Sequence, residues 1–167
     1  MITAINERRS IRKFQPDMSV TKEQLNQLLH AAMLAPSAKN SRPWEFIAIT
    51  KREILDEFAR SHPFGQMFKT ATAAIVVVAL PQPEPLLGYF PQDCGAASQN
   101  ILLEAVEMGL GTCWLGIWPK EPRMTWLSEL LDIREPKVPF NIIAIGVPDE
   151  NPKQRGFFEE SKVAYIG

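Results

Sequence analysis

The 167-residue sequence has few of the residues that build metal and thiol sites. Its two cysteines, Cys94 and Cys113, fit neither a CxxC pair nor a zinc-binding spacing. Its two histidines, His30 and His62, lie far apart and have no ligand-like neighbours. We therefore expect no metal centre, and we expect both thiols to be small apolar groups in the core.

The common motifs for nucleotide binding and nucleophilic catalysis are missing too. Gly109, Gly111 and Gly116 are spaced wrongly for a GxGxxG fingerprint, and there is neither a Walker A sequence nor a GxSxG elbow. No pair of carboxylates stands out, and no histidine is placed to activate a serine or a cysteine. An enzyme with so few catalytic side chains would depend on a cofactor for its chemistry.

The chain also lacks a strong net charge and a long apolar run. Its net charge is −1 and its pI is about 6.1, which argues against a nucleic-acid partner. No run of about twenty apolar residues occurs, so we expect no membrane span. The first residues lack the apolar segment of a secretory signal, so we expect a cytoplasmic protein. An apolar share of 46% supports one domain over 1–167.

Against this neutral background, the segment 8–13 carries four cations in six positions. A solvated charged surface is one interpretation of such a run. However, Ser10 and Ile11 interrupt the charges, so a hydroxyl group and a buried anchor would fix the direction of the guanidinium groups. A second basic pair, Lys153 and Arg155, lies near the other end of the chain. If the two clusters meet, they would bind a phosphorylated ligand, because guanidinium forks match phosphate oxygens.

The hydrophobic pattern predicts alternating helices and strands, followed by a polar arm. Thr21 and Gln24 have the spacing of a capping box. The valine-rich run 73–80 is typical of a strand buried on both faces, and the prolines of 81–85 exclude regular structure. The helix over 92–108 is apolar on most of its surface, so it is buried or lies at a subunit interface. We expect helices over 19–35, 51–60, 92–108 and 122–131, strands over 45–50, 73–80, 111–118 and 138–147, and an arm over 148–167. This order predicts a sheet covered by helices on both faces.

Three stretches together resemble the FMN-dependent nitroreductase family. They are Arg8–Arg12 (RRSIR) after a short helix, Ala35–Trp44 (APSAKNSRPW) before a strand, and Gly109–Gly116 (GLGTCWLG) with Pro152–Arg155 (PKQR) near the end. Each stretch alone is a weak signal. Their order and their distances are specific, and the resemblance covers nearly the whole chain.

The resemblance implies an α+β fold, built as an α/β/α sandwich on a mixed, mainly antiparallel sheet. It implies a homodimer that exchanges its C-terminal arms, residues 148–167, and holds two FMN molecules at its interface. NAD(P)H would be the transient hydride donor. Contacts to the phosphate, ribityl chain and pyrimidine are implied for Arg8, Arg9, Ser10, Arg12, Lys153 and Arg155. Contacts from the other subunit are implied for Pro36, Ser37, Ala38 and Asn40. Contacts around the flavin ring are implied for Gly65, Gln66, Lys69, Leu115 and Gly116.

The implied function is hydride transfer from NAD(P)H through FMN to an electron-poor acceptor, such as a nitroaromatic or a quinone, by a ping-pong mechanism. No side chain is expected to be catalytic, because FMN would carry the chemistry. The alternatives are a flavin sensor or carrier without turnover, a specialised flavin enzyme such as a dehalogenase, and a phosphate-ester-binding domain.

Several single residues leave their roles open. Ser37 and Asn40 are also good turn residues, and Trp44 is a good core residue. The sequence departs from the family at Ala38, where many relatives have a hydroxyl, and at Arg42, where glutamine is common. A proline turn over 81–90 replaces the helices that roof the substrate pocket in larger relatives.

Overall fold

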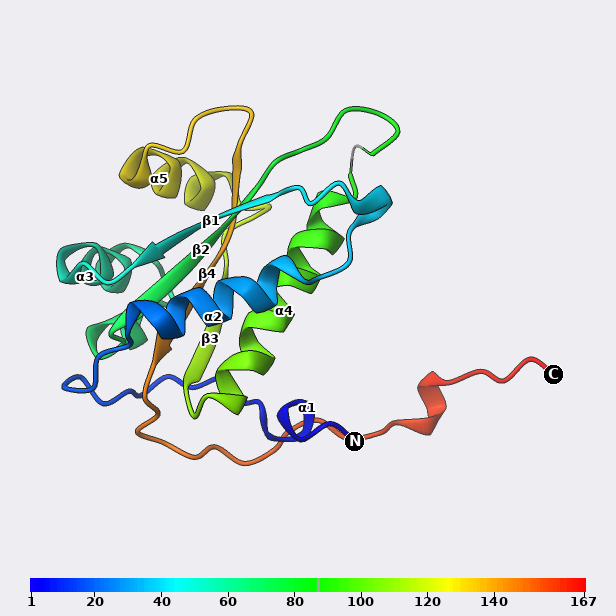
Figure 1. Cartoon of the computed structure of the whole chain (residues 1–167), viewed down its shortest axis with the longest axis horizontal. Coiled ribbons are helices and arrows are strands. Elements are labelled where there is room, and N and C mark those ends of the chain that lie inside the picture. Colours follow the sequence, from blue (N-terminus) through cyan, green and yellow to red (C-terminus); the bar gives the residue numbers. More distant parts are fainter. Residues whose placement is uncertain (87) are drawn as a thin grey trace.

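The computed structural model describes residues 1–86 and 88–167, which form three layers (Figure 1). Helices α2 and α4 cover one face of a four-stranded sheet, and α3 and α5 cover the other. The helices are α1 (Thr3–Glu7), α2 (Lys22–Met33), α3 (Arg52–Ser61), α4 (Phe90–Glu107) and α5 (Glu121–Leu131). The strands are β1 (Trp44–Ile49), β2 (Ala73–Ala79), β3 (Gly111–Gly116) and β4 (Val138–Gly146). Three short 3₁₀-helices are η1 (Ala38–Asn40), η2 (Gln66–Lys69) and η3 (Glu160–Lys162).

The predicted α+β sandwich is confirmed, with small displacements of the element ends. The described residues of the 81–86 segment form no helix or strand, as the prolines predict. Residue 87 of the turn expected over 81–90 lies outside the described residues. No helix in the described part of the chain is long and apolar enough to cross a bilayer.

The sheet has the strand order β1-β2-β4-β3, and every neighbouring pair is antiparallel. Among the described residues, its parallel component is a single bridge between Ser10 and Thr112, on the outer edge of β3. The strand β2 is buried along its whole length, as its valine-rich sequence predicts. Its side chains alternate between two cores: Ala74, Val76 and Val78 pack with α3 and α5, and Ala73, Ile75 and Val77 pack with α2 and α4.

Local capping sets where α2 begins. Thr21 and Gln24 form both halves of the predicted capping box: the Thr21 Oγ1 accepts from the Gln24 amide at 3.2 Å, and the Gln24 Oε1 accepts from the Thr21 amide at 2.9 Å. Since Thr21 is the cap, the first helical residue is Lys22 and not Ser19, where the hydrophobic pattern had placed it.

A buried polar pair joins β4 to α4. The Asn141 Nδ2 donates to the Ser98 Oγ at 2.7 Å, and that hydroxyl donates to the Cys94 carbonyl at 2.7 Å. The predicted burial of both cysteines is confirmed. Burial raises the pKa of the Cys94 thiol to about 12, and the nearby Asp93 adds to the effect.

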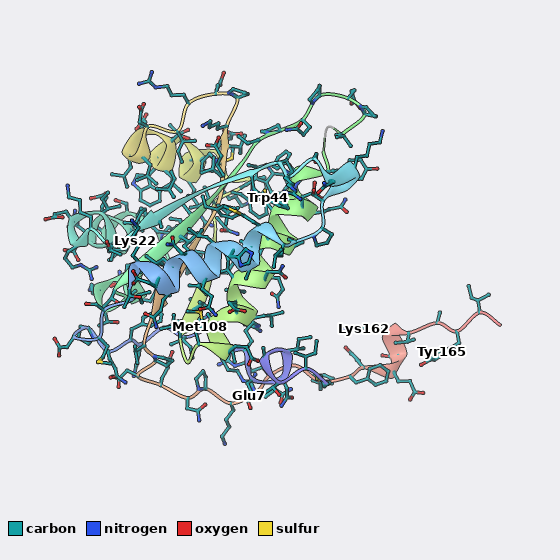
Figure 2. All side chains as sticks on the ribbon, in the orientation of Figure 1. Glu7, Lys22, Trp44, Met108, Lys162 and Tyr165 are labelled. Atoms are coloured by element: carbon teal, nitrogen blue, oxygen red, sulfur yellow. The ribbon has the colours of Figure 1, made fainter. Side chains whose placement is uncertain are left out.

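The arm begins against the body and then leaves it. Phe14 pairs with Pro148 in an antiparallel bridge, and the Asp149 amide donates to the Lys13 carbonyl at 2.9 Å. Beyond this root the chain extends away from the sandwich (Figure 1), and the side chains of Lys162 and Tyr165 stand clear of the other layers (Figure 2). Its apolar side chains are open to solvent, with exposed fractions of 81% for Phe157, 82% for Tyr165 and 99% for Ile166.

Candidate functional site

The two basic clusters meet, as the sequence predicts. A cavity of about 290 Å³ opens between α1, the segment that follows it and the start of the arm. It is lined by Ile5, Arg8, Arg9, Ser10, Arg12, Pro152, Lys153, Gln154, Arg155 and Gly156. Residues 145 positions apart in the chain thus share one concave surface.

Backbone contacts hold both walls of this cavity. The Ile11 side chain is buried, and its amide donates to the Thr112 carbonyl at 2.9 Å, so residues 8–12 are fixed to the edge of β3. Gly111 permits this contact, because a Cβ atom there would lie 2.9 Å from the Ile11 side chain. On the arm side, the Glu150 carboxylate accepts from the amides of Arg12 and Lys13. The arm therefore enters beside the cation run.

The cavity is strongly positive, since five of its lining residues are cations and none of those described is acidic. Two arginines are held: the Arg9 Nη1 donates to the Asn6 carbonyl at 2.7 Å, and the Arg12 Nη1 donates to the Ser10 carbonyl at 3.3 Å. The Arg9 Nε is buried and has no acceptor. A phosphate would supply acceptors for such donors, so the residues present fit the phosphate of FMN.

The free cations lie on both walls. Within the described part of the chain, the side chains of Arg8, Lys153 and Arg155 form no hydrogen bond or ion pair with another protein group. Like charges at this density repel one another, so a bound anion would stabilise this arrangement.

The loop between α2 and β1 has a strained but well-held backbone. Lys39, Asn40 and Arg42 have φ values of 50°, 54° and 49°, in the left-handed region that only glycine adopts freely. The Ser37 Oγ accepts from the Arg42 amide at 2.9 Å, and the Asn40 Oδ1 accepts from the Arg42 Nε at 3.0 Å. Ser37 and Asn40 therefore act as turn residues within the single chain.

This loop lies at the first end of α4, whereas α1, whose residue Ile5 lines the basic cavity, lies at the other end (Figure 1). The Ala38 amide donates at 3.1 Å to the Oδ1 of Asp93, in the first turn of α4, whereas Val106, in the last turn, borders a second cavity that also touches Arg9. Thirteen residues of helix separate the two points, about 20 Å at 1.5 Å per residue. None of the predicted loop residues, Pro36 included, lines the basic cavity.

Three of the predicted ring contacts, Gly65, Gln66 and Lys69, are in the connection between α3 and β2. Gly65 is buried, and a Cβ atom there would lie 2.1 Å from the Phe58 carbonyl oxygen, so packing alone requires glycine. Gln66 is exposed, and its Nε2 donates to the Ala59 carbonyl at 3.3 Å. The amide group of Gln66 is thus oriented by the last turn of α3.

The other two are at the end of β3. The Leu115 side chain is buried in the core shared with α3 and α5, so it anchors the end of β3 to that core. Gly116 is exposed, and no heavy atom lies within 4 Å of the position of a Cβ atom. Its carbonyl oxygen accepts from the Arg123 Nη1 at 2.8 Å and lies 3.4 Å from the His62 Nε2. The space above Gly116 is open to a ligand.

Comparison with known proteins identifies the family. The Nitroreductase family profile matches residues 5–74 and 61–147. The chain belongs to the nitroreductase family. It is 43% identical over 163 residues to a Methanothermobacter thermautotrophicus protein with the provisional name NADH dehydrogenase/NAD(P)H nitroreductase, covering 98% of this chain and 85% of that protein. An Archaeoglobus fulgidus protein of the same provisional name is 44% identical over 160 residues, covering 93% of this chain and 87% of its own length.

Solved nitroreductase structures share the whole fold. An FMN-dependent nitroreductase from Clostridium difficile superposes with a TM-score of 0.88 at 33% identity, covering 100% of this chain and 99% of that one. A nitroreductase from Desulfovibrio desulfuricans, solved in complex with FMN, superposes with a TM-score of 0.82 at 29% identity, covering 99% and 96%.

The roles of some polar residues that hold the site in place were not predicted from the sequence. Glu150 fixes the arm, Asp93 holds the loop, and Arg123 binds the Gly116 carbonyl. An acidic residue at the root of a basic arm was the available signal for Glu150. Asp93 and Arg123 have no local signal, because their partners are distant in sequence or belong to the backbone.

Proposed function

We propose that this nitroreductase is an FMN-dependent oxidoreductase that uses NAD(P)H, and that two copies of the chain build each FMN site. The observation that carries the proposal is the convergence of Arg8, Arg12, Lys153 and Arg155 on one cavity within a nitroreductase fold. The relatives' names supply the nicotinamide donor and the flavin. When bound, FMN would take hydride from NAD(P)H and pass it to an electron-poor acceptor, such as a nitroaromatic or a quinone, in a ping-pong sequence.

The chain's own residues would bind and orient FMN. Arg8, Lys153 and Arg155 have free donors for phosphate oxygens, and Arg9 offers its buried Nε. The Arg12 backbone is fixed by Glu150, so its guanidinium enters the cavity from a rigid wall. These cations would keep FMN on the protein between the two half-reactions.

The end of β3 would receive the flavin ring. Gly116 leaves open space where a side chain would stand, so a planar ring could approach the backbone closely. The Gly116 carbonyl is held by the Arg123 side chain and lies near the His62 ring. The chain offers no side chain with an evident proton-transfer role, and water could supply the proton.

Two features of the single chain support a homodimer. The arm exposes Phe157, Phe158, Tyr165 and Ile166, which bury nothing in one copy. The loop that carries Ser37 is about 20 Å along α4 from the basic cavity, so it would contact the FMN of the partner. Analytical ultracentrifugation tests this inference, and a monomer at micromolar concentration would contradict it.

The visible spectrum of freshly purified protein is the first test. We expect the absorption bands of bound flavin, their bleaching by NADH or NADPH without oxygen, and their recovery with an acceptor. A flavin spectrum that neither nucleotide bleaches would favour a sensor or carrier over an enzyme. A colourless protein that takes up no added FMN would contradict the proposal.

Charge removal tests the phosphate site. Arg8→Ala and Arg155→Ala each remove a charge-assisted contact of roughly 1.5–3 kcal/mol, so FMN should bind about ten- to a hundredfold more weakly. Arg134→Ala is the matched control, because Arg134 is exposed and pairs only with Asp132. If both site variants bind FMN like the control, the phosphate binds elsewhere.

A further inference from the structure

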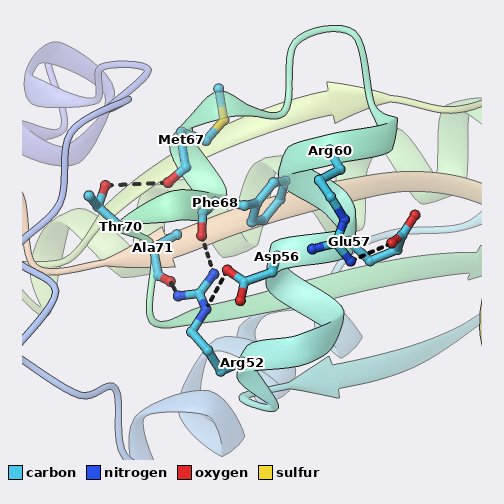
Figure 3. Close-up of polar contacts among 8 residues, drawn as sticks. All are labelled: Arg52, Asp56, Glu57, Arg60, Met67, Phe68, Thr70 and Ala71. Carbon is cyan, nitrogen blue, oxygen red and sulfur yellow. Dashed lines mark hydrogen bonds and ion pairs between the residues drawn. The ribbon is translucent and has the colours of Figure 1, made fainter.

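An arginine of α3 is bound to the end of η2 (Figure 3). The Arg52 Nη1 donates to the Ala71 carbonyl at 2.9 Å, and its Nη2 donates to the Phe68 carbonyl. Its Nε donates to the Asp56 Oδ1 at 2.9 Å, one helical turn along α3. Three nitrogen atoms of one planar group thus have fixed acceptors, an arrangement that a lysine cannot reproduce.

The Phe68 carbonyl is one of those that a helix end leaves without partners, and Ala71 follows two residues after the end of η2. The last carbonyls of a helix have no amide to accept from, and a cation there also offsets their negative end. Phe68 is the third residue of η2, and its carbonyl belongs to the peptide group that joins it to Lys69. Arg52 therefore holds the peptide plane from which the Lys69 side chain starts.

A second contact links the same segment to the cation run. The Thr70 Oγ1 accepts from the Phe14 amide at 3.3 Å, two residues after Arg12. Lys69 is exposed, and its side chain forms no hydrogen bond or ion pair with another described residue. The segment that Arg52 fixes thus carries a free cation beside the segment 8–14 that forms one wall of the phosphate cavity.

From these contacts we infer that Arg52 is a positioning residue: it fixes η2 so that the Lys69 ammonium group points at the flavin. The inference rests on the proposed function, since it names how one cation of that site is oriented. A cation held beside the flavin ring stabilises negative charge that develops there, so its position sets both the affinity for FMN and the reduction potential.

The first experiment needs no cofactor. The Thr70 and Ala71 amides, just after η2, donate to the carbonyl of Met67 in η2. In Arg52→Ala these amides should exchange with deuterium about tenfold faster, because two hydrogen bonds that hold the segment are lost. Arg60→Ala is the matched control, since Arg60 lies on the same helix and pairs only with Glu57 (Figure 3). Unchanged exchange in Arg52→Ala would overturn the inference.

The second experiment asks whether Arg52 acts through Lys69. Arg52→Ala should weaken FMN binding about tenfold, the lower end of the range for residues that orient a ligand-binding group. It should also make the midpoint potential of bound FMN more negative. In the Lys69→Gln protein, where the ammonium group is already absent, Arg52→Ala should change neither quantity further. Additive effects of the two substitutions on the potential would refute the inference.

Two controls separate this result from other failures. Thr21→Ala removes the cap of α2, lowers stability by about 1 kcal/mol, and removes none of the contacts that Arg52 makes, so it should leave the potential unchanged. A potential that falls equally in Thr21→Ala and Arg52→Ala would assign Arg52 to general stability and would overturn the inference. If the wild-type protein binds no FMN, the proposed function itself has failed.

Discussion

Replacing Gly65 by alanine should destabilise the folded protein through packing alone, whether or not FMN is bound. A Cβ atom at this position would lie 2.1 Å from the Phe58 carbonyl oxygen and 3.1 Å from the His62 carbonyl oxygen. Both are backbone atoms, so no side chain can rotate away. The turn must therefore open to admit the Cβ atom. Opening it weakens two hydrogen bonds: the Gly65 amide donates to the His62 carbonyl at 2.9 Å, and the Phe68 amide donates to the Gly65 carbonyl at 2.9 Å.

The size of the effect follows from overpacking. Forcing an extra carbon into a packed site costs about 1–3 kcal/mol, and contact with backbone puts Gly65→Ala near the upper end. With roughly 2.1 cal/mol/K of unfolding entropy per residue, 167 residues give about 350 cal/mol/K. A loss of about 3 kcal/mol therefore lowers Tm by about 9 °C.

Gly116→Ala is the control variant for this prediction. No heavy atom lies within 4 Å of its Cβ position, so the FMN-free protein should melt like the wild type, while its affinity for FMN falls. Thermal melts should use FMN-free protein at one concentration, because bound ligand and association both raise Tm. A wild-type Tm in Gly65→Ala, or an equal loss in both variants, would refute the reasoning.

Three further predictions concern polar groups. Glu150→Ala frees the Arg12 amide and loosens the arm, so FMN should bind about tenfold more weakly in a fluorescence titration; unchanged affinity would contradict this. Burial lowers the pKa of His62 from 6.5, so the unfolded chain takes up the proton first, and stability should fall as the pH drops below about 6.5. Tm measured from about pH 8 to about pH 5 should depend less on pH in His62→Phe; an equally steep profile would count against this. Ser98→Ala leaves the Asn141 Nδ2 without its acceptor and should cost about 1–3 kcal/mol with FMN affinity unchanged, as chemical denaturation and titration would show.

The parts of the fold that could be predicted are those with a local cause. The strand β2 is apolar at every position, and Thr21 and Gln24 stand at capping distance, so short segments determine their own structure. The meeting of the two basic clusters was expected from the resemblance to the nitroreductase family, and the burial of Ile11, which divides the cation run, was predictable from its apolar side chain.

The rest depends on contacts that no short segment reveals. Glu150 and Arg12 are 138 positions apart, and only the antiparallel pairing of the arm root brings them together. Lys39 and Arg42 take left-handed backbone angles although neither is glycine, because Ser37 and Asp93 hold the loop from outside. In the sequence, Arg52 resembles an ordinary surface residue, because its partner Ala71 is 19 positions away and only the fold brings the two together.

In the proposed dimer, the helix α4 would link one FMN site to the other. Its first turn holds the loop through Asp93, and its last turn lies against α1 and borders the second cavity, which shares Arg9 with the basic one. In the proposed dimer, the first end would serve the neighbour's flavin and the second end its own. A rigid helix cannot tilt at one end alone, so loading one centre would alter the other, and FMN would then titrate with cooperativity rather than as two independent sites.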